Sequence, residues 1–89
     1  MWDWDEPKRQ ANLAKHGVDF RVMPEFNWIS ALVRVDDRYD YGEVRLKAEG
    51  LIEDRLHSVT YTERGPVKRI ISLRKANKRE VLEWASQRR

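Results

Sequence analysis

The stretch "RLHSVTYTERGPVKRIISLRKANKRE", residues 55–80, contains two predicted strands and the start of a helix. Residues 55–62 and 67–73 are rich in β-branched and apolar side chains, and the short "ERGP" break between them favours an antiparallel hairpin. Asn77 and Glu80 have the spacing of a helix capping box, in which each residue satisfies a backbone N–H of the first turn. A hairpin followed directly by a capped helix indicates an α+β domain.

Two helices are predicted before this stretch. Residues 5–16 combine an acidic cap with good helix formers, and Gly17 follows as a stop signal. The segment "VDFRVMPEF", residues 18–26, predicts a short second helix capped by Asp19. Pro24 lacks a backbone donor and should distort that second helix.

Two more strands are predicted at residues 28–35 and 44–48, separated by the polar loop "DDRYDYGE". The second of them is followed by the break "EGLIED" at residues 49–54. The expected fold is therefore a single α+β domain over residues 1–89, with a small antiparallel four-stranded sheet, N-terminal helices and a C-terminal helix. The buried side of the last helix is expected to consist of Val81, Leu82, Trp84 and Ala85.

Composition restricts the class of protein. A chain of 89 residues can build one modest core, and the absence of cysteine excludes disulfides, thiolate metal sites and thiol nucleophiles. No apolar run approaches the roughly 18 residues that span a bilayer, and the start "MWDWDEPKRQ" is too acidic for a signal peptide. We therefore expect a soluble protein of the cytoplasm that has no contact with a membrane.

Charge is distributed unevenly along the chain. Residues 64–89 hold nine Lys or Arg against two Asp or Glu, whereas residues 1–63 hold nine against thirteen. A local excess of positive charge of this size suggests a polyanionic partner for the C-terminal part.

Four cations gather where the last helix begins. Lys78 and Arg79 are its first residues, and Arg74 and Lys75 come just before it. A helix N-terminus carries about half a positive charge, so each cation there costs about 0.3–1 kcal/mol. A phosphate backbone or an acidic segment of a partner protein, bound at this helix N-terminus, would relieve the repulsion.

Four motifs in this order resemble the BrnT toxin family: "WDEPKRQANLAKHGVDF", "DDRYDYGEVR", "DRLHSVTYTERG" and "RIISLRKANKRE". The resemblance runs from Trp4 to about Trp84. It implies a RelE-like fold and a ribonuclease toxin of a type II toxin–antitoxin pair. It further implies a ribbon-helix-helix antitoxin, BrnA, that neutralises the toxin in a hetero-oligomer, for example of two copies of each protein. In this complex the antitoxin alone would contact operator DNA and repress the shared operon. Pro24 departs from the family, which has an ordinary short helix there.

Cleavage of RNA without a metal requires activation of the 2′-hydroxyl, stabilisation of charge on the phosphorus centre and protonation of the leaving 5′-oxygen. Arg is suited to the charge because it contacts phosphate through two N–H groups, and His or Glu can carry protons. The candidate catalytic residues are Arg64, Arg69, Arg74, His57 and Glu43. The candidate phosphate-binding residues are Arg45, Lys68, Lys75, Lys78 and Arg79.

Several of these residues have an alternative role. His57 could be a packed strand residue, Glu43 could hold its loop by pairing with Arg45 or Arg64, and Tyr41 and Tyr61 could be core or stacking aromatics.

Strand alternation bears on the two arginines of the last strand. Arg69 and Arg74 point to opposite faces unless the strand ends or bulges between them.

No cofactor or metal is predicted. The two histidines, His16 and His57, are far apart in sequence and lack a nearby acidic pattern. Gly42, Gly50 and Gly65 are interpreted as isolated turn glycines, not as a phosphate loop. A nucleic-acid-binding module and an antitoxin-binding module, both without catalysis, are the alternatives to a ribonuclease, because a basic α+β domain alone does not indicate an enzyme.

Overall fold

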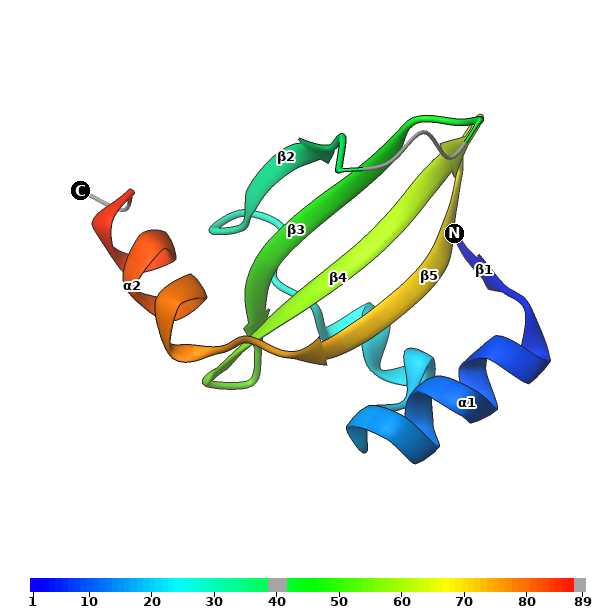
Figure 1. The fold of residues 1–89 in the computed structure, drawn as a ribbon, viewed down its shortest axis with the longest axis horizontal. Helices are drawn as coiled ribbons and strands as arrows, with labels where there is room; N and C mark the ends of the chain where they lie inside the picture. Colours follow the sequence, from blue (N-terminus) through cyan, green and yellow to red (C-terminus); the bar gives the residue numbers. More distant parts are fainter. Residues whose placement is uncertain (39–41, 88–89) are drawn as a thin grey trace.

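The structure is a computed structural model that describes residues 1–38 and 42–87, and it confirms the α+β class (Figure 1). One sheet has the strand order β1-β5-β4-β3-β2. Its strands are β1 (Trp2–Trp4), β2 (Leu32–Asp36), β3 (Arg45–Ile52), β4 (Arg55–Arg64) and β5 (Val67–Lys75). The helices are α1 (Glu6–His16), the 3₁₀ helix η1 (Phe20–Glu25) and α2 (Lys78–Ser86).

The sheet contains one strand more than the four predicted. The additional strand, β1, pairs in parallel with β5, with Trp2 opposite Lys68 and Trp4 opposite Ile70. Three residues are too few for a strand pattern to be recognised, although Trp2, Asp3 and Trp4 alternate apolar and polar side chains. The pairing depends on a strand at the far end of the chain, so only the tertiary structure brings the two together.

Strand β2 begins at Leu32 and not at residue 28, as the apolar composition predicted. The side-chain Oδ1 of Asn27 accepts hydrogen bonds from the backbone N–H groups of Ile29, at 3.1 Å, and Ser30, at 3.4 Å. An asparagine that binds the backbone two residues ahead forms a local turn. This turn delays the strand by four residues.

Strand β3 extends through most of the segment predicted as a break and ends at Ile52. The turn consists of Glu53 and Asp54 alone, with Glu53 at a φ of 57°. Gly50 is a strand residue and not a turn glycine. Its lack of a side chain admits the ring of Phe26, since a Cβ built there would lie 2.5 Å from Phe26 Cζ.

The N-terminal helices form as predicted. Asp5 caps α1 by accepting a hydrogen bond from Lys8 N–H at 3.3 Å, and Gly17 ends the helix in the left-handed conformation. The second helix, η1, is capped by Asp19 and contains Pro24. Its 3₁₀ form is consistent with a short segment from which proline removes a backbone donor.

Helix α1 is attached to the outer side of β5 by the buried Asn12. Its side-chain amide donates to Leu73 O at 2.7 Å and to Val18 O at 3.0 Å, and its Oδ1 accepts from Leu73 N–H at 3.1 Å. Beyond the short β1, this edge of β5 would otherwise expose unpaired backbone groups. Asn12 thus replaces a neighbouring strand at that position.

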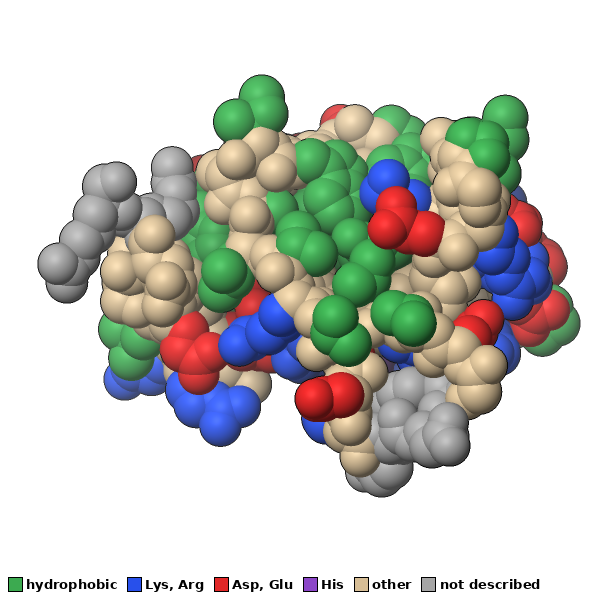
Figure 2. Space-filling view, turned by 90° about the horizontal axis from the view of Figure 1, so that it is seen from above, with side chains coloured by type: hydrophobic (Ala, Val, Ile, Leu, Met, Phe, Trp, Pro, Cys, Tyr) green, Lys and Arg blue, Asp and Glu red, His purple; other side chains and the backbone are tan. Residues whose placement is uncertain are grey.

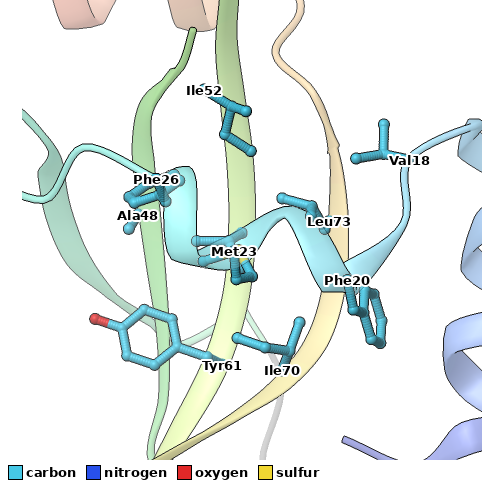
Figure 3. Packing of buried hydrophobic residues seen from close by; sticks show 10 residues of the cluster. Val18, Phe20, Met23, Phe26, Ala48, Ile52, Tyr61, Ile70 and Leu73 are labelled. Carbon is cyan, nitrogen blue, oxygen red and sulfur yellow. The ribbon is translucent and has the colours of Figure 1, made fainter. Parts of the chain in front are cut away.

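The hydrophobic core lies between one face of the sheet and the segment containing η1 (Figure 3). Residues of this segment pack against alternate side chains of three adjacent strands, β3, β4 and β5. The buried cluster consists of Val18, Phe20, Met23, Phe26, Ala48, Ile52, Val59, Tyr61, Ile70 and Leu73.

Helix α2 does not bury the apolar side that its sequence predicted. Val81 and Leu82 are 39% and 63% exposed, Ala85 is exposed, Trp84 is half-buried, and the buried residue is Glu80. The reason is the location of α2, which lies against the sheet face opposite the core. That face carries polar side chains, so a carboxylate and not an apolar group points inward.

Candidate functional site

A β-bulge in β5 decides which face its arginines share. Val59 pairs with Leu73 and Thr60 with Ser72, but the next residue, Tyr61, pairs with Ile70. Ile71 is therefore an extra residue in the ladder, and Leu73 and Ile70 both face the core although they are three residues apart. Their neighbours Arg74 and Arg69 consequently both project from the opposite face.

We call this opposite side of β2 to β5 the polar face. Its floor is β4, whose hydroxyl residues Ser58, Thr60 and Thr62 are at most 9% exposed. They are buried because longer, mostly charged side chains of the neighbouring strands rise around them. Those side chains belong to Arg34, Asp36, Arg45, Lys47, Glu49, Arg69 and Arg74.

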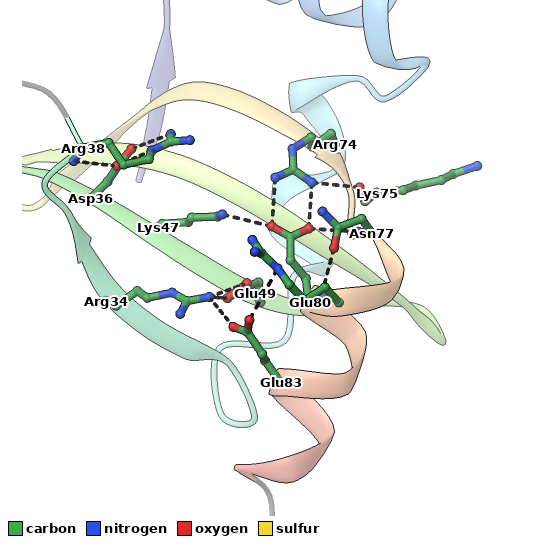
Figure 4. Close-up of polar contacts among 11 residues, drawn as sticks. Arg34, Asp36, Arg38, Lys47, Glu49, Arg74, Lys75, Asn77, Glu80 and Glu83 are labelled. Atoms are coloured by element: carbon green, nitrogen blue, oxygen red, sulfur yellow. Dashed lines mark hydrogen bonds and ion pairs between the residues drawn. The ribbon is translucent and has the colours of Figure 1, made fainter.

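At one end of the polar face, the Glu80 carboxylate of α2 collects four hydrogen bonds (Figure 4). Arg74 Nη1 and Nη2 donate at 2.8 and 2.9 Å, and Lys47 Nζ donates at 2.9 Å. The backbone N–H of Asn77 donates at 2.9 Å, and Asn77 Oδ1 in return accepts from Glu80 N–H at 2.8 Å. The predicted capping box is thus confirmed, and its acid also bridges α2 to β3 and β5.

Electrostatics keep this carboxylate charged. The Arg74 guanidinium, helped by Asn77 N–H and Lys47, holds the pKa of Glu80 far below its ordinary value against the effect of burial. Of the four cations at the start of α2, Arg74 therefore binds an anion that the chain itself provides, and Lys47 of β3 binds the same anion.

A second group of ion pairs connects β2 to the same helix. Arg34 Nη2 lies 2.6 Å from an oxygen of the fully buried Glu49 and 3.4 Å from one of Glu83. Asp36 is bound by Arg38 at 2.8 Å, which lowers the pKa of the Asp36 carboxyl. Between β2 and α2 lies a groove of about 260 Å³ whose lining includes four cations, Arg34, Arg38, Lys47 and Arg79.

The other end of the polar face holds three more of the predicted arginines. Arg69 lies beside Thr62 in the ladder and binds Asp3 of β1 at 2.6 Å. Arg64 lies 3.7 Å from Glu43, and both side chains are well exposed. Arg45 is the first residue of β3 and lies at the same end, because its neighbour Leu46 pairs with Tyr61, the residue before Thr62. Four candidates, Arg45, Arg64, Arg69 and Glu43, therefore gather at this end. Tyr41 lies outside the described residues.

Three candidates lie on the core side of the sheet. His57 is buried, its Nδ1 lies 2.8 Å from Arg55 O, and burial lowers the pKa of its imidazole. Lys75 is opposite His57 in the ladder, and both line a groove beside α1 and η1. Lys68 pairs with Glu63 at 3.6 Å and lies 5.5 Å from the ring centre of Trp28. None of the three shares a face with Arg69 and Arg74.

Two further candidates belong to the first turn of α2. Lys78 is exposed, and Arg79 is directed along the helix, with its Nε 3.6 Å from Oε1 of Glu83.

Tyr61 of β4 packs in the core, and burial raises the pKa of its phenol.

The motifs of the chain match a family model over residues 4–80, most of the 89 residues; its description is "Ribonuclease toxin, BrnT, of type II toxin-antitoxin system". The chain belongs to the BrnT toxin family. A comparison with curated proteins finds no match. As a BrnT member, the chain comes from a family of ribonuclease toxins, and a type II system implies an antitoxin protein as partner.

The polar face of this BrnT chain contains residues that sequence reasoning did not select. Arg34, Lys47 and Glu49 alternate with apolar residues in β2 and β3, and this alternation was a usable signal. The sequence does not indicate which face of the sheet is open, so the alternation alone did not single out these residues.

Within residues 1–38 and 42–87, no group of three His, Asp or Glu side chains is arranged to hold a metal ion. No helix in the described part of the BrnT chain is long and apolar enough to cross a membrane.

Proposed function

We propose that this chain is an endoribonuclease that cleaves RNA in the cytoplasm without a metal ion and binds the RNA on the polar face. The observation that carries the proposal is the bulge at Ile71, because it puts Arg69 and Arg74 on the same face as Arg45 and Lys47. Several cations on one surface can contact successive phosphates, and Arg contacts phosphate through two parallel hydrogen bonds.

Cleavage would occur at the end of the polar face that holds Arg69, Arg45, Arg64 and Glu43. The 2′-oxygen bonds to phosphorus and the bond from phosphorus to the 5′-oxygen breaks, while the arginines stabilise the extra negative charge. Glu43 accepts the proton of the 2′-hydroxyl and returns a proton to the 5′-oxygen. Its exposure and its long 3.7 Å contact with Arg64 leave it accessible to substrate.

The proposal assigns no chemical step to His57. The imidazole is buried on the other face of the sheet, beside α1 and η1. Lys68 and Lys75 also lie on that side. They can bind RNA only if the chain of nucleotides passes around an edge of the sheet.

The first experiment compares Arg69→Ala with Asp3→Asn. Both changes break the same 2.6 Å ion pair, but only the first removes a cation from the polar face. Each protein is incubated with a defined RNA in excess chelator, and the product ends are mapped. Loss of one charge-stabilising group typically costs about 100-fold or more in rate, so Arg69→Ala should be nearly inactive. Asp3→Asn should keep activity within about threefold of the original protein.

Three results would contradict parts of this proposal. Cleavage that disappears in chelator would contradict metal independence. Equal activity of Arg69→Ala and the original protein would remove Arg69 from the site. Salt-dependent RNA binding without cleavage products would support a nucleic-acid-binding module instead.

We also propose that the antitoxin is a ribbon-helix-helix protein of the BrnA type, which neutralises this chain in a hetero-oligomer and alone contacts operator DNA. Exposed apolar side chains support a protein partner: Ile29, Val33, Val35 and Val44 are 99%, 45%, 59% and 68% exposed. We call this set the apolar edge. Co-expression with a ribbon-helix-helix protein encoded beside this chain, followed by measurement of the mass of the complex, tests the partner and the ratio.

A further inference from the structure

Helix α2 is attached to the sheet mainly by its charged residues. Glu80 binds Arg74 and Lys47, and Glu83 lies 3.4 Å from Arg34. Of the apolar residues of the helix, Val81 and Leu82 stay exposed, and Trp84 adds one attachment, because its half-buried ring donates a hydrogen bond to Ser30 O at 2.9 Å. A helix that buries little apolar surface gains little of the hydrophobic stabilisation that holds α1 and η1 in place.

The contacts of Glu80 are those of a bound anion. Two parallel N–H groups of Arg74, at 2.8 and 2.9 Å, form the fork that binds either a carboxylate or a phosphate. Lys47 and the backbone N–H of Asn77, both at 2.9 Å, complete the donor set. A phosphate group of RNA could accept the same hydrogen bonds from Arg74 and Lys47 if the carboxylate moved away.

The chain offers a point at which this movement can begin. Ala76 is held to the sheet by a 3.0 Å hydrogen bond from its N–H to Leu56 O. Asn77, the next residue, has an extended backbone and precedes the first turn of α2. A rotation at Asn77 would therefore release α2 without disturbing β5 or the core.

We propose that Arg74 and Lys47 form an RNA phosphate subsite that Glu80 occupies in the free protein, so that α2 is a lid which RNA must displace. The inference rests on the proposed function in one respect, that RNA is the ligand of the polar face. The lid lowers the apparent affinity for RNA by the fraction of molecules in which it is open. It also gives Arg74, one of the four cations at the start of α2, two alternative anions, because Arg74 and Lys47 bind the carboxylate in the free protein and the phosphate in the complex.

The test measures binding and not cleavage. Its probe is a 2′-O-methyl oligoribonucleotide, which keeps the phosphate backbone but has no free 2′-hydroxyl to attack phosphorus. Affinity is measured by fluorescence anisotropy for the original chain of residues 1–89 and three variants. Glu80→Gln removes the competing charge, Trp84→Ala weakens the lid without changing charge, and Glu25→Gln is a matched change at an exposed acid of η1.

We expect Glu80→Gln and Trp84→Ala to bind the probe about tenfold more tightly, as they would if about one molecule in ten is open in the original protein. Glu25→Gln should stay within about threefold, because it alters only the general charge. In the original protein, the backbone amides of residues 81–87 should exchange with solvent faster when the probe is bound, since the lid is then open.

Three outcomes overturn the inference, and a fourth separates it from the proposed function. If both variants bind like the original protein, or no protein binds the probe, Glu80 does not compete with RNA. If only Glu80→Gln binds more tightly, charge alone explains the gain and α2 is not a lid. Slower amide exchange in α2 on binding leads to the same conclusion. Tighter binding by both variants, without cleavage of unmodified RNA by the original protein, would support the lid and contradict the proposed ribonuclease activity.

Discussion

Single residues decide where the charges of this protein point. Ile71 is the extra residue of the bulge, and without it the alternation of β5 would send Arg69 to the core side. Asn12 has a comparable effect on α1, because one amide satisfies both backbone groups of Leu73. Neither residue contacts a substrate in the proposed mechanism, yet both determine which surfaces the sheet presents.

Gly50 provides a prediction at the residue scale. A Cβ at this position would lie 2.5 Å from Cζ and 2.8 Å from Cε1 of the buried Phe26 ring, so one of them must shift. We expect Gly50→Ala to lower the free energy of unfolding by about 1–3 kcal/mol, as overpacking of a core does. Urea unfolding of the variant measures this.

The double variant Gly50→Ala, Phe26→Leu is the control for that contact. A smaller side chain at residue 26 should make room for the methyl group, so the two losses of stability should be less than additive. Strict additivity would show that the contact with Phe26 is not the cause.

At the scale of elements, β2 and α2 are the least enclosed parts of the fold. Strand β2 pairs with β3 alone and forms one edge of the sheet. Hydrophobic side chains gather in the middle of the surface in Figure 2, which views the molecule from the side that is at the top of Figure 1, where β2 lies. Helix α2, near the C-terminus, lies on the polar face and contacts the charged side chains of Lys47 and Arg74. The proposed antitoxin surface includes β2, and the proposed RNA site is covered by α2.

The apolar edge gives a prediction for β2. A carboxylate at residue 35, which is 59% exposed, would be buried unpaired by a partner that covers the apolar edge. We therefore expect Val35→Asp to weaken antitoxin binding at least about tenfold while RNA cleavage is retained. Calorimetric titration with the purified antitoxin measures the change.

Leu13→Asp is the matched control for this prediction, because Leu13 is 40% exposed on α1, away from the apolar edge. It should bind the antitoxin like the original protein. If Leu13→Asp and Val35→Asp weaken binding equally, the apolar edge is not the specific docking surface.

At the scale of the whole molecule, the two faces of the sheet have different chemistry. The core face holds the apolar cluster, α1 and η1, and the polar face holds ion pairs that join β2, β3, β5 and α2 (Figures 3 and 4). Several carboxyls have a pKa below the ordinary range because an arginine or a backbone N–H binds them, namely Glu6, Asp19, Asp36 and Glu80. The stability of the molecule should therefore depend on acid pH.

The sign of this dependence follows from linkage. A carboxyl whose pKa is lowered by folding stabilises the protein above its unfolded pKa of about 4.3, and this stabilisation is lost as pH falls toward the folded pKa. The original protein should exceed Glu80→Gln in unfolding free energy by about 1–2 kcal/mol near pH 7. The difference should shrink below about pH 4, as measured by urea unfolding at a series of pH values.

The matched variant Glu25→Gln should show a difference that is small at every pH, because Glu25 is exposed. A difference between the original protein and Glu80→Gln that stays constant from pH 7 to pH 3 would contradict the role given to the Glu80 charge.

The sequence of this protein predicted the features that depend on neighbouring residues. Helix caps such as Asp5 and Asn77, the stop at Gly17, the hairpin before β5 and the family motifs depend on residues close together in the chain, so their patterns predicted α1, η1, β4, β5 and the start of α2. The candidate arginines were selected from the same segments.

Only the tertiary structure decided the rest, because it depends on contacts between distant residues. The parallel pairing of β1 with β5, the burial of Glu80 in place of Leu82, and the separation of His57 from Arg69 each require two segments to meet. A one-residue bulge reverses the direction of every side chain beyond it, and alternation in the sequence does not reveal it. The chain sequence thus determined most of the elements and the family, while β1 and the faces of the sheet were determined by how the elements pair.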